Sequence, residues 1–99
     1  MCGIAGYIKS IDLNADIDIK KSLEFLKSRG PDDSGIYKES NISLGHTRLS
    51  ILDISDAGHQ PSICSLSGSV LTFNGEIYNF KKLRKYLDSK TAISWKRNS

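Results

Sequence analysis

The order of strand-like and helix-like segments is the feature that most constrains this fold. The apolar run "GIAGYI" predicts a buried strand over residues 3–8, almost at the N-terminus. A helix follows, then several strands, a second helix and one more strand. These later segments are expected at 35–38, 41–52, 69–75, 79–89 and 91–96. Runs of strands with segregated helices favour an α+β fold with mostly antiparallel pairing.

Both helices are predicted from apolar spacing and from residues that begin or end helices. The first runs to about Ser28 from a cap at Asp16 or Asp18, and Gly30-Pro31 ends it. Its apolar face repeats at helical spacing: Ile19, Leu23 and Leu26. The second helix follows Asn79, a residue type that caps helices, and its apolar positions are Phe80, Leu83 and Leu87. The polar stretch "DISDAGHQPS" before it is expected to be a loop.

Composition excludes several classes of protein. The chain has 99 residues, 38% hydrophobic and 25% charged, which is typical of a soluble globular domain. Its net charge of +3 is spread out, whereas a nucleic-acid surface needs a dense basic stripe with stacking aromatics. Cys2 and Cys64 alone make no disulfide framework. Without a secretory signal or an apolar run of about 20 residues, we expect a cytoplasmic protein that binds neither nucleic acid nor membrane.

Cys2 stands directly behind the initiator methionine. Removal of Met1 is favoured when the second residue is small, so Cys2 can become the N-terminal residue. Its own α-amine can then take the thiol proton, and one residue supplies both nucleophile and base. The alternative is an incidental or packed cysteine, since cysteine is among the most buried residue types.

Arg48 interrupts the strand-like stretch "GHTRLSIL". Arginine suits a carboxylate ligand because it donates two parallel N–H bonds, although a surface salt bridge is the commoner role of a lone arginine. His46 shares its side-chain direction on a strand and either orients a partner or is structural. No second histidine stands near it, so the sequence predicts no metal site.

The stretch "FNGEIYN" delivers Asn74 and Gly75 into a turn that is followed by Glu76. An asparagine side-chain N–H and a glycine backbone N–H can stabilise an oxyanion formed in acyl transfer. Glu76 can hold a substrate ammonium group. Asn-Gly is also the commonest hairpin turn pair, but the helical pattern that follows weakens a hairpin interpretation.

The stretch "RGPDDSG" follows the first predicted helix. Arg29 favours the negative end of the helix dipole there. Asp32 and Asp33 are interpreted as solvated turn formers, neither an acid–base pair nor metal ligands.

Five motifs together resemble a known family. "MCGIAGY", "RGPDDSG", "LGHTRLSILD", "AGHQP" and "FNGEIYNF" occur in the order seen in the glutaminase domain of class II, or N-terminal nucleophile, glutamine amidotransferases. The branch that the chain most resembles is glutamine-hydrolysing asparagine synthetase. The resemblance implies an N-terminal nucleophile hydrolase fold, a four-layer α/β/β/α sandwich of antiparallel sheets, of which this chain holds the N-terminal half.

The resemblance also implies a role for each matching residue. Cys2 attacks the glutamine side-chain amide, with its own amine as base. Arg48 binds the substrate α-carboxylate, and Glu76 contacts the α-amino group. The Asn74 side chain and the Gly75 backbone form the oxyanion hole.

The implied reaction has two halves. Glutamine becomes glutamate and ammonia, and a second domain uses ATP and Mg²⁺ to aminate aspartate. No cofactor is expected within residues 1–99, and the full-length protein is expected to form a homodimer.

Family glutaminase domains are longer than this chain. We therefore expect residues 1–99 to be the truncated N-terminal portion of such a domain, without the synthetase domain and with little activity alone. Two alternatives remain: an inactive or regulatory fragment, and another class II amidotransferase, such as one that modifies surface sugars.

Overall fold

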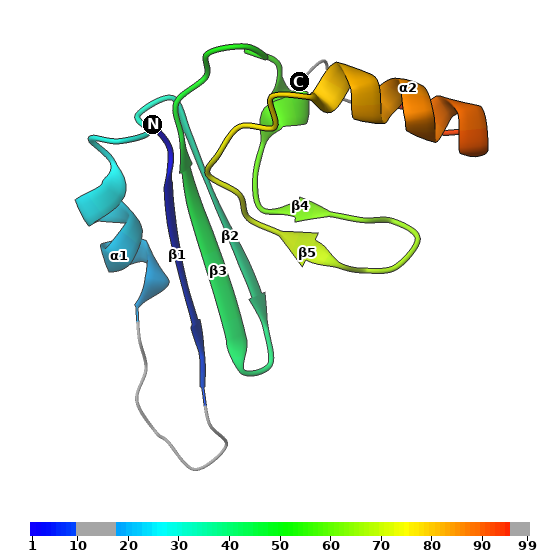
Figure 1. Cartoon of the computed structure of the whole chain (residues 1–99). Helices are drawn as coiled ribbons and strands as arrows, with labels where there is room; N and C mark the ends of the chain where they lie inside the picture. The colour runs from blue at the N-terminus through cyan, green and yellow to red at the C-terminus, as the bar shows by residue number, and fades with distance from the viewer. Residues whose placement is uncertain (10–17, 96–99) are drawn as a thin grey trace.

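A three-stranded antiparallel sheet forms the centre of the N-terminal region (Figure 1). The structure is a computed structural model that describes residues 1–9 and 18–95. The strands are β1 (Gly3–Ile8), β2 (Asp33–Glu39) and β3 (Ile42–Arg48), in the order β1-β3-β2. The predicted strand at 3–8 is confirmed, and β2 extends beyond the predicted 35–38 at both ends.

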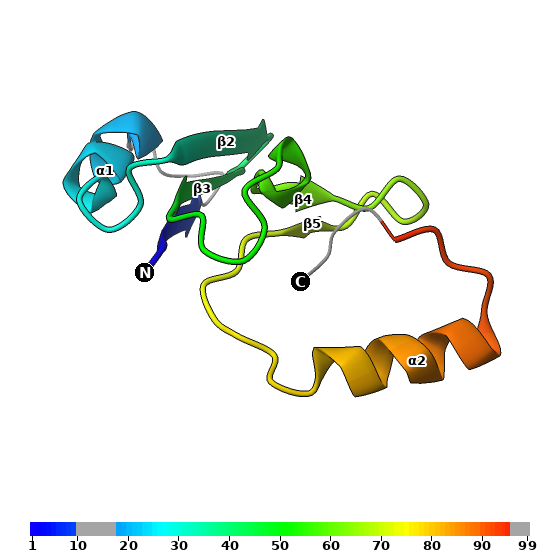
Figure 2. The ribbon, with the colours of Figure 1, turned by 90° about the horizontal axis from the view of Figure 1, so that it is seen from above.

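The first helix, α1 (Ile19–Leu26), covers one face of this sheet. Figure 2 shows α1 on one side of the sheet and the later elements of the chain, from residue 62 to residue 90, on the other. Ile19 and Leu23 are buried and lie against Gly45 of β3. Asp18 caps the helix by accepting a 3.0 Å bond from the Lys20 N–H. The other predicted cap, Asp16, lies outside the described residues.

Strand alternation gives β3 two chemically different faces. Ser43 and Thr47 lie on the α1 side, where the Thr47 hydroxyl donates to the Leu26 carbonyl at 3.2 Å. His46 and Arg48 point to the opposite face because successive side chains of a strand alternate.

The C-terminal region is more open. A 3-10 turn, η1 (Asp56–Gly58), precedes a two-stranded antiparallel pair, β4 (Ser62–Ile63) and β5 (Val70–Leu71). The second helix, α2 (Phe80–Lys90), is confirmed close to its predicted bounds, but none of its residues is buried. It packs against no other described helix or strand and lies apart from the sheet in both views (Figures 1 and 2).

Two predicted strands are wrong in extent. The strand expected at 41–52 ends at Arg48, because the Ser50 N–H turns aside to the Asp32 carboxylate at 2.7 Å. The strand expected at 69–75 is only β5, since the Phe73 N–H bonds the Gln60 side chain instead of a strand. Conversely, the loop expected at 53–62 contains η1 and the start of β4.

Residues 91–95 do not form the predicted final strand, and Lys96 lies outside the described residues. They fold back on α2 instead. The Trp95 indole N–H donates to the Asp88 carboxylate at 2.6 Å, and the Arg84 guanidinium lies 4.7 Å from the Trp95 ring centroid. Asn79 precedes α2, but its side chain makes no capping bond.

Two small antiparallel sheets and two separate helices agree with the predicted α+β class. Within the described residues, neither helix combines the length and apolar character that crossing a membrane requires.

Candidate functional site

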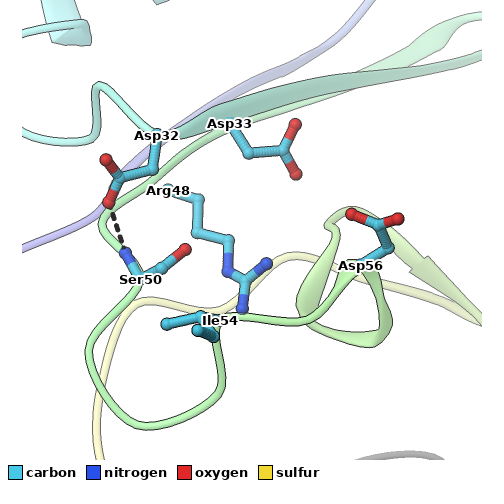
Figure 3. A pocket seen from close by; sticks show the side chains of 6 residues that line it. All are labelled: Asp32, Asp33, Arg48, Ser50, Ile54 and Asp56. Atoms are coloured by element: carbon cyan, nitrogen blue, oxygen red, sulfur yellow. Dashed lines mark hydrogen bonds between the residues drawn. The ribbon is translucent and has the colours of Figure 1, made fainter.

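An open pocket of about 400 Å³ lies where β3 ends, on the sheet face opposite α1. Figure 3 shows Arg48 extending through it, with the Asp32 and Asp33 carboxylates on one side and the loop that follows β3 on the other. The pocket is lined by Asp32, Asp33, Arg48, Ser50, Ile54 and Asp56. Three carboxylates around one guanidinium give it a polar, mixed-charge wall.

Cys2 reaches the edge of this region through the β1–β3 register. Gly3 pairs with Thr47, so the preceding residue comes level with Arg48. The Leu49 N–H donates to the Cys2 sulfur at 3.4 Å, and the thiol lies 3.8 Å from the Leu49 carbonyl oxygen. Cys2 is only half-buried. The structure therefore places a partly accessible thiol, with a hydrogen-bond donor on its sulfur, beside the segment that carries Arg48.

Arg29 contacts the backbone of Cys2. Its Nε donates to the Cys2 carbonyl oxygen at 3.3 Å. Arg29 lies just beyond the C-terminal end of α1, as predicted, and this bond connects it to the residue before β1.

Arg48 is 8% exposed, so it does not occupy the surface position that the alternative interpretation, a surface salt bridge, requires. Its Nη1 donates to the Ser55 carbonyl at 2.8 Å, and its Nη2 donates to the Asp53 carbonyl. A Cβ on Gly58 would lie 2.0 Å from Nη2, so only glycine allows the loop this close to the guanidinium. A guanidinium has five N–H donors, so donors remain for a carboxylate ligand.

The two adjacent aspartates are not merely solvated turn formers. The Asp32 carboxylate accepts the Ser50 N–H bond, and Asp33 pairs with Arg48 in the β2–β3 register. The Asp33 carboxylate also contacts the His59 Nδ1 at 2.6 Å. These contacts fix the loop that follows β3 to the N-terminal end of β2.

His46 lies two residues before Arg48 on the same face and is 0% exposed. Its Nε2 lies 3.2 Å from the Phe73 carbonyl oxygen, while its Nδ1 has no hydrogen-bond partner among the residues that the structure describes. Burial lowers the pKa of His46, and the bond to Phe73 opposes this effect only partly. The His46 imidazole therefore makes a structural contact with the segment that contains Asn74 and Gly75, the predicted oxyanion-hole residues.

Asn74, Gly75 and Glu76 are all exposed. In the described part of the chain, no hydrogen bond joins them to Cys2 or Arg48. The structure thus brings two of the five predicted site residues together and connects the other three to β3 indirectly, through Phe73.

Sequence reasoning missed several contacts. The bond from Leu49 to the Cys2 sulfur cannot be predicted from the residue type, because its donor is a backbone N–H. The bond between Gln60 and Phe73 joins residues thirteen positions apart. The "AGHQP" motif was the available signal for His59 and Gln60. Among the residues described, no cluster of histidine, cysteine or acidic side chains has an arrangement suited to a metal ion.

Comparison with known proteins gives a match along the whole chain. Residues 1–99 match a family described as "Glutamine amidotransferase domain". The chain is similar to glutamine-hydrolyzing asparagine synthetase B of Escherichia coli, with 45% identity over 89 residues covering 85% of this chain and 15% of that protein. No solved structure gives a significant match.

Two further relatives are also glutamine-hydrolyzing asparagine synthetases. Glutamine-hydrolyzing asparagine synthetase of Brassica oleracea is 42% identical over 90 residues, and synthetase 3 of Bacillus subtilis is 38% identical over 91 residues. Each alignment covers 88% of this chain and 15% of the relative. The chain therefore spans about 15% of the length of these curated relatives.

Proposed function

Because the chain belongs to the glutamine amidotransferase domain family, we propose that it is part of a glutaminase in which Cys2 is the nucleophile. The observation that carries the proposal is the position of the Cys2 thiol. The β1–β3 register brings it level with Arg48, and the Leu49 N–H contacts its sulfur at 3.4 Å. A nucleophile beside a guanidinium suits a substrate whose carboxylate lies a short distance from the bond to be broken.

Removal of Met1 starts the proposed mechanism. Met1 is 72% exposed, so the bond between Met1 and Cys2 lies at the surface. The new α-amine takes the thiol proton, and the sulfur attacks the glutamine side-chain carbonyl. The C–N bond then breaks and ammonia leaves with the proton returned from the amine. Water attacks the resulting thioester and releases glutamate and the free thiol.

Arg48 and Glu76 are the proposed substrate-binding residues. The N–H donors of Arg48 that do not bond the loop carbonyls bind the α-carboxylate, and Glu76 contacts the α-amino group. A pocket of about 400 Å³ lies beside Arg48, within the size range of small-molecule sites. The Asn74 side chain and the Gly75 backbone N–H are the proposed oxyanion donors.

The rest of the reaction is proposed for the whole protein. We propose a second, ATP- and Mg²⁺-dependent domain that aminates aspartate, and a homodimeric, cytoplasmic enzyme. The likeness to glutamine-hydrolyzing asparagine synthetases supports the synthetase part of this proposal. No residue of this chain is assigned to ATP or Mg²⁺. The two antiparallel sheets and the helix on one face are compatible with part of the four-layer sandwich of N-terminal nucleophile hydrolases.

A covalent-labelling experiment tests the proposal on this chain. Intact mass first separates molecules with and without Met1. Both forms are then treated with a glutamine analogue that carries a diazoketone in place of the amide, and the adduct is mapped by peptide mass spectrometry. We expect the adduct on Cys2, only in the form without Met1.

Matched variants control for ordinary thiol chemistry. Cys2→Ala should abolish the adduct, whereas Cys64→Ser, at an exposed cysteine, should leave it unchanged. An adduct that forms equally on Cys64, or that forms on Cys2 with Met1 retained, would contradict the proposed mechanism. Hydrolysis of glutamine by residues 1–99 alone is expected to be weak.

A further inference from the structure

The peptide groups of Phe73 are held from two sides by side chains. The Phe73 N–H donates to the Gln60 Oε1 at 2.7 Å, and the Phe73 carbonyl oxygen lies 3.2 Å from the His46 Nε2. β5 ends at Leu71, so neither group belongs to a strand ladder. The contact with His46 is partly buried, and the bond to Gln60 is exposed. Phe73 is therefore fixed by two specific side chains at the position directly before Asn74.

The His46 imidazole acts as a donor in this contact. A carbonyl oxygen can only accept, so the hydrogen lies on Nε2. In the neutral ring Nδ1 is then a bare acceptor, which agrees with its lack of a partner. A second proton on Nδ1 would be buried without an acceptor, which is costly. The contact is thus made by neutral His46 with one defined tautomer.

The second side chain of the pair is itself anchored. The preceding residue, His59, contacts the Asp33 carboxylate of β2 at 2.6 Å. A Cβ on Gly35 would lie 2.1 Å from the Gln60 carbonyl oxygen, so the loop backbone lies directly on β2. His46 and Gln60 therefore hold Phe73 from the sheet itself and from a loop fixed to that sheet.

The Phe73 ring reaches the predicted oxyanion segment. A Cβ on Gly75 would lie 2.7 Å from the ring Cζ. Because the Phe73 backbone is held in place, the position of its ring is restricted as well. The ring packs directly against Gly75, which is also joined to Phe73 through the chain.

We propose that His46 and Gln60 are positioning residues that hold Phe73, and through it the Asn74–Gly75 segment, in place for catalysis. This rests on the proposed function, because that proposal gives Asn74 and Gly75 the oxyanion. His46 does not touch the substrate in this account. It acts only through the Phe73 carbonyl.

Backbone dynamics in this chain test the proposal without any need for turnover. We would measure ¹⁵N order parameters of Asn74 and Gly75, for which about 0.85 indicates a rigid backbone and values below about 0.6 a flexible one. The unaltered chain should lie near the rigid value. His46→Ala should lower both residues toward the flexible value, and Gln60→Leu should do the same.

Rescue and control variants give the result its specificity. His46→Gln keeps an N–H donor and should retain most of the rigidity. Thr47→Ala is the matched control, because it removes a buried hydrogen bond of the same strand on the α1 face. Rigid Asn74 and Gly75 in both His46→Ala and Gln60→Leu would overturn the proposal, as would equal loosening by Thr47→Ala. If His46→Ala does not fold, Gln60→Leu and His46→Gln decide the question.

A spectroscopic signature checks the tautomer separately. Imidazole ¹⁵N shifts should show a neutral His46 with hydrogen on Nε2 and none on Nδ1. Hydrogen on Nδ1 alone would overturn the assigned contact.

The diazoketone experiment separates this proposal from the proposed function. Loosening of Asn74 and Gly75 together with slower labelling of Cys2 supports both. Loosening with unchanged labelling upholds the positioning contacts and contradicts the oxyanion role of the segment. Rigid Asn74 and Gly75 overturn the positioning contacts, whatever the labelling rate.

Discussion

The N-terminal sheet and the C-terminal helix differ in how their apolar residues are used. α1 buries Ile19 and Leu23 against the sheet, whereas Leu83 and Leu87 of α2, at equivalent helical spacing, remain substantially exposed. Both helices were predicted from the same periodicity. The difference teaches that helical spacing identifies a helix but does not say whether its apolar face has a partner within the chain.

The candidate site crosses the boundary between these two regions. Cys2 and Arg48 belong to the tightly packed sheet, while Asn74, Gly75 and Glu76 lie in the exposed segment that leads to α2. The contacts of Phe73 with His46 and Gln60 connect the two. The comparison therefore predicts that substitutions in the sheet cost stability and that equivalent substitutions in α2 do not.

The largest expected effect comes from the core beneath α1. Leu23→Ala removes a buried side chain and should lower the free energy of unfolding by about 2–5 kcal/mol. Urea unfolding followed by far-UV circular dichroism measures the loss. Leu87→Ala is the control on α2, where Leu87 is 38% exposed. Similar losses in the two variants would contradict the contrast between the regions.

The next largest effect is expected from the Arg48 guanidinium, which lines the pocket. Arg48→Met leaves the Ser55 and Asp53 carbonyls without their donor. A hydrogen bond to a charged group contributes about 1.5–3 kcal/mol. Arg48 is buried, so urea unfolding should show a loss of about that size.

Arg84 on α2 supplies the matched control for that substitution. Its guanidinium stacks on the exposed Trp95 ring, a contact worth about 0.5–1 kcal/mol, so Arg84→Met should cost less than Arg48→Met. A loss for Arg84→Met as large as that for Arg48→Met would contradict the contrast between the sheet and α2.

The pH dependence of stability should report buried His46. Burial lowers its pKa in the folded chain below the ordinary value of 6.5. Below about pH 6.5 the unfolded chain therefore binds a proton that the folded chain does not. The free energy of unfolding should fall as pH decreases, by at most about 1.4 kcal/mol per pH unit from this group.

The His46→Gln variant isolates that contribution. Asp33, Arg48 and His59 also act on His46 electrostatically and remain in the variant. The difference between the two unfolding profiles between pH 7 and pH 5 is the measurement. Parallel profiles would show that His46 does not stay neutral in the fold.

The smallest expected effect compares the starts of the two helices. Asp18→Ala removes the bond to the Lys20 N–H and should cost about 1 kcal/mol. Asn79→Ala should change stability by less than about 0.5 kcal/mol, because the Asn79 side chain makes no capping bond. Thermal unfolding of the two variants side by side checks the order, and a larger cost for Asn79→Ala would reverse it.

Much of the fold follows from local sequence signals. The apolar run at 3–8 and the helical spacings predict β1, α1 and α2, because local periodicity decides those elements. The early end of β3 and the two-residue β5 do not follow, because side chains distant in sequence take the backbone donors of Ser50 and Phe73. Short-range patterns carry no information on such bonds.

The candidate site was likewise predicted only in part from the sequence. Residue types identified Cys2, Arg48 and the Asn74–Gly75 pair as chemically suitable. The proximity of Cys2 to Leu49 depends on the strand register, which relates positions 47 apart in sequence. The contact of Asp33 with His59 likewise joins segments that no local pattern connects.

The central claim is that Cys2 is a thiol built into a glutamine site, and its alkylation rate is the most direct measurement. The chain without Met1 is treated with a small alkylating agent, and the rates at Cys2 and Cys64 are followed by peptide mass spectrometry with and without glutamine. The account predicts that glutamine slows alkylation of Cys2 and leaves Cys64 unchanged. Equal rates at Cys2 with and without glutamine would contradict it.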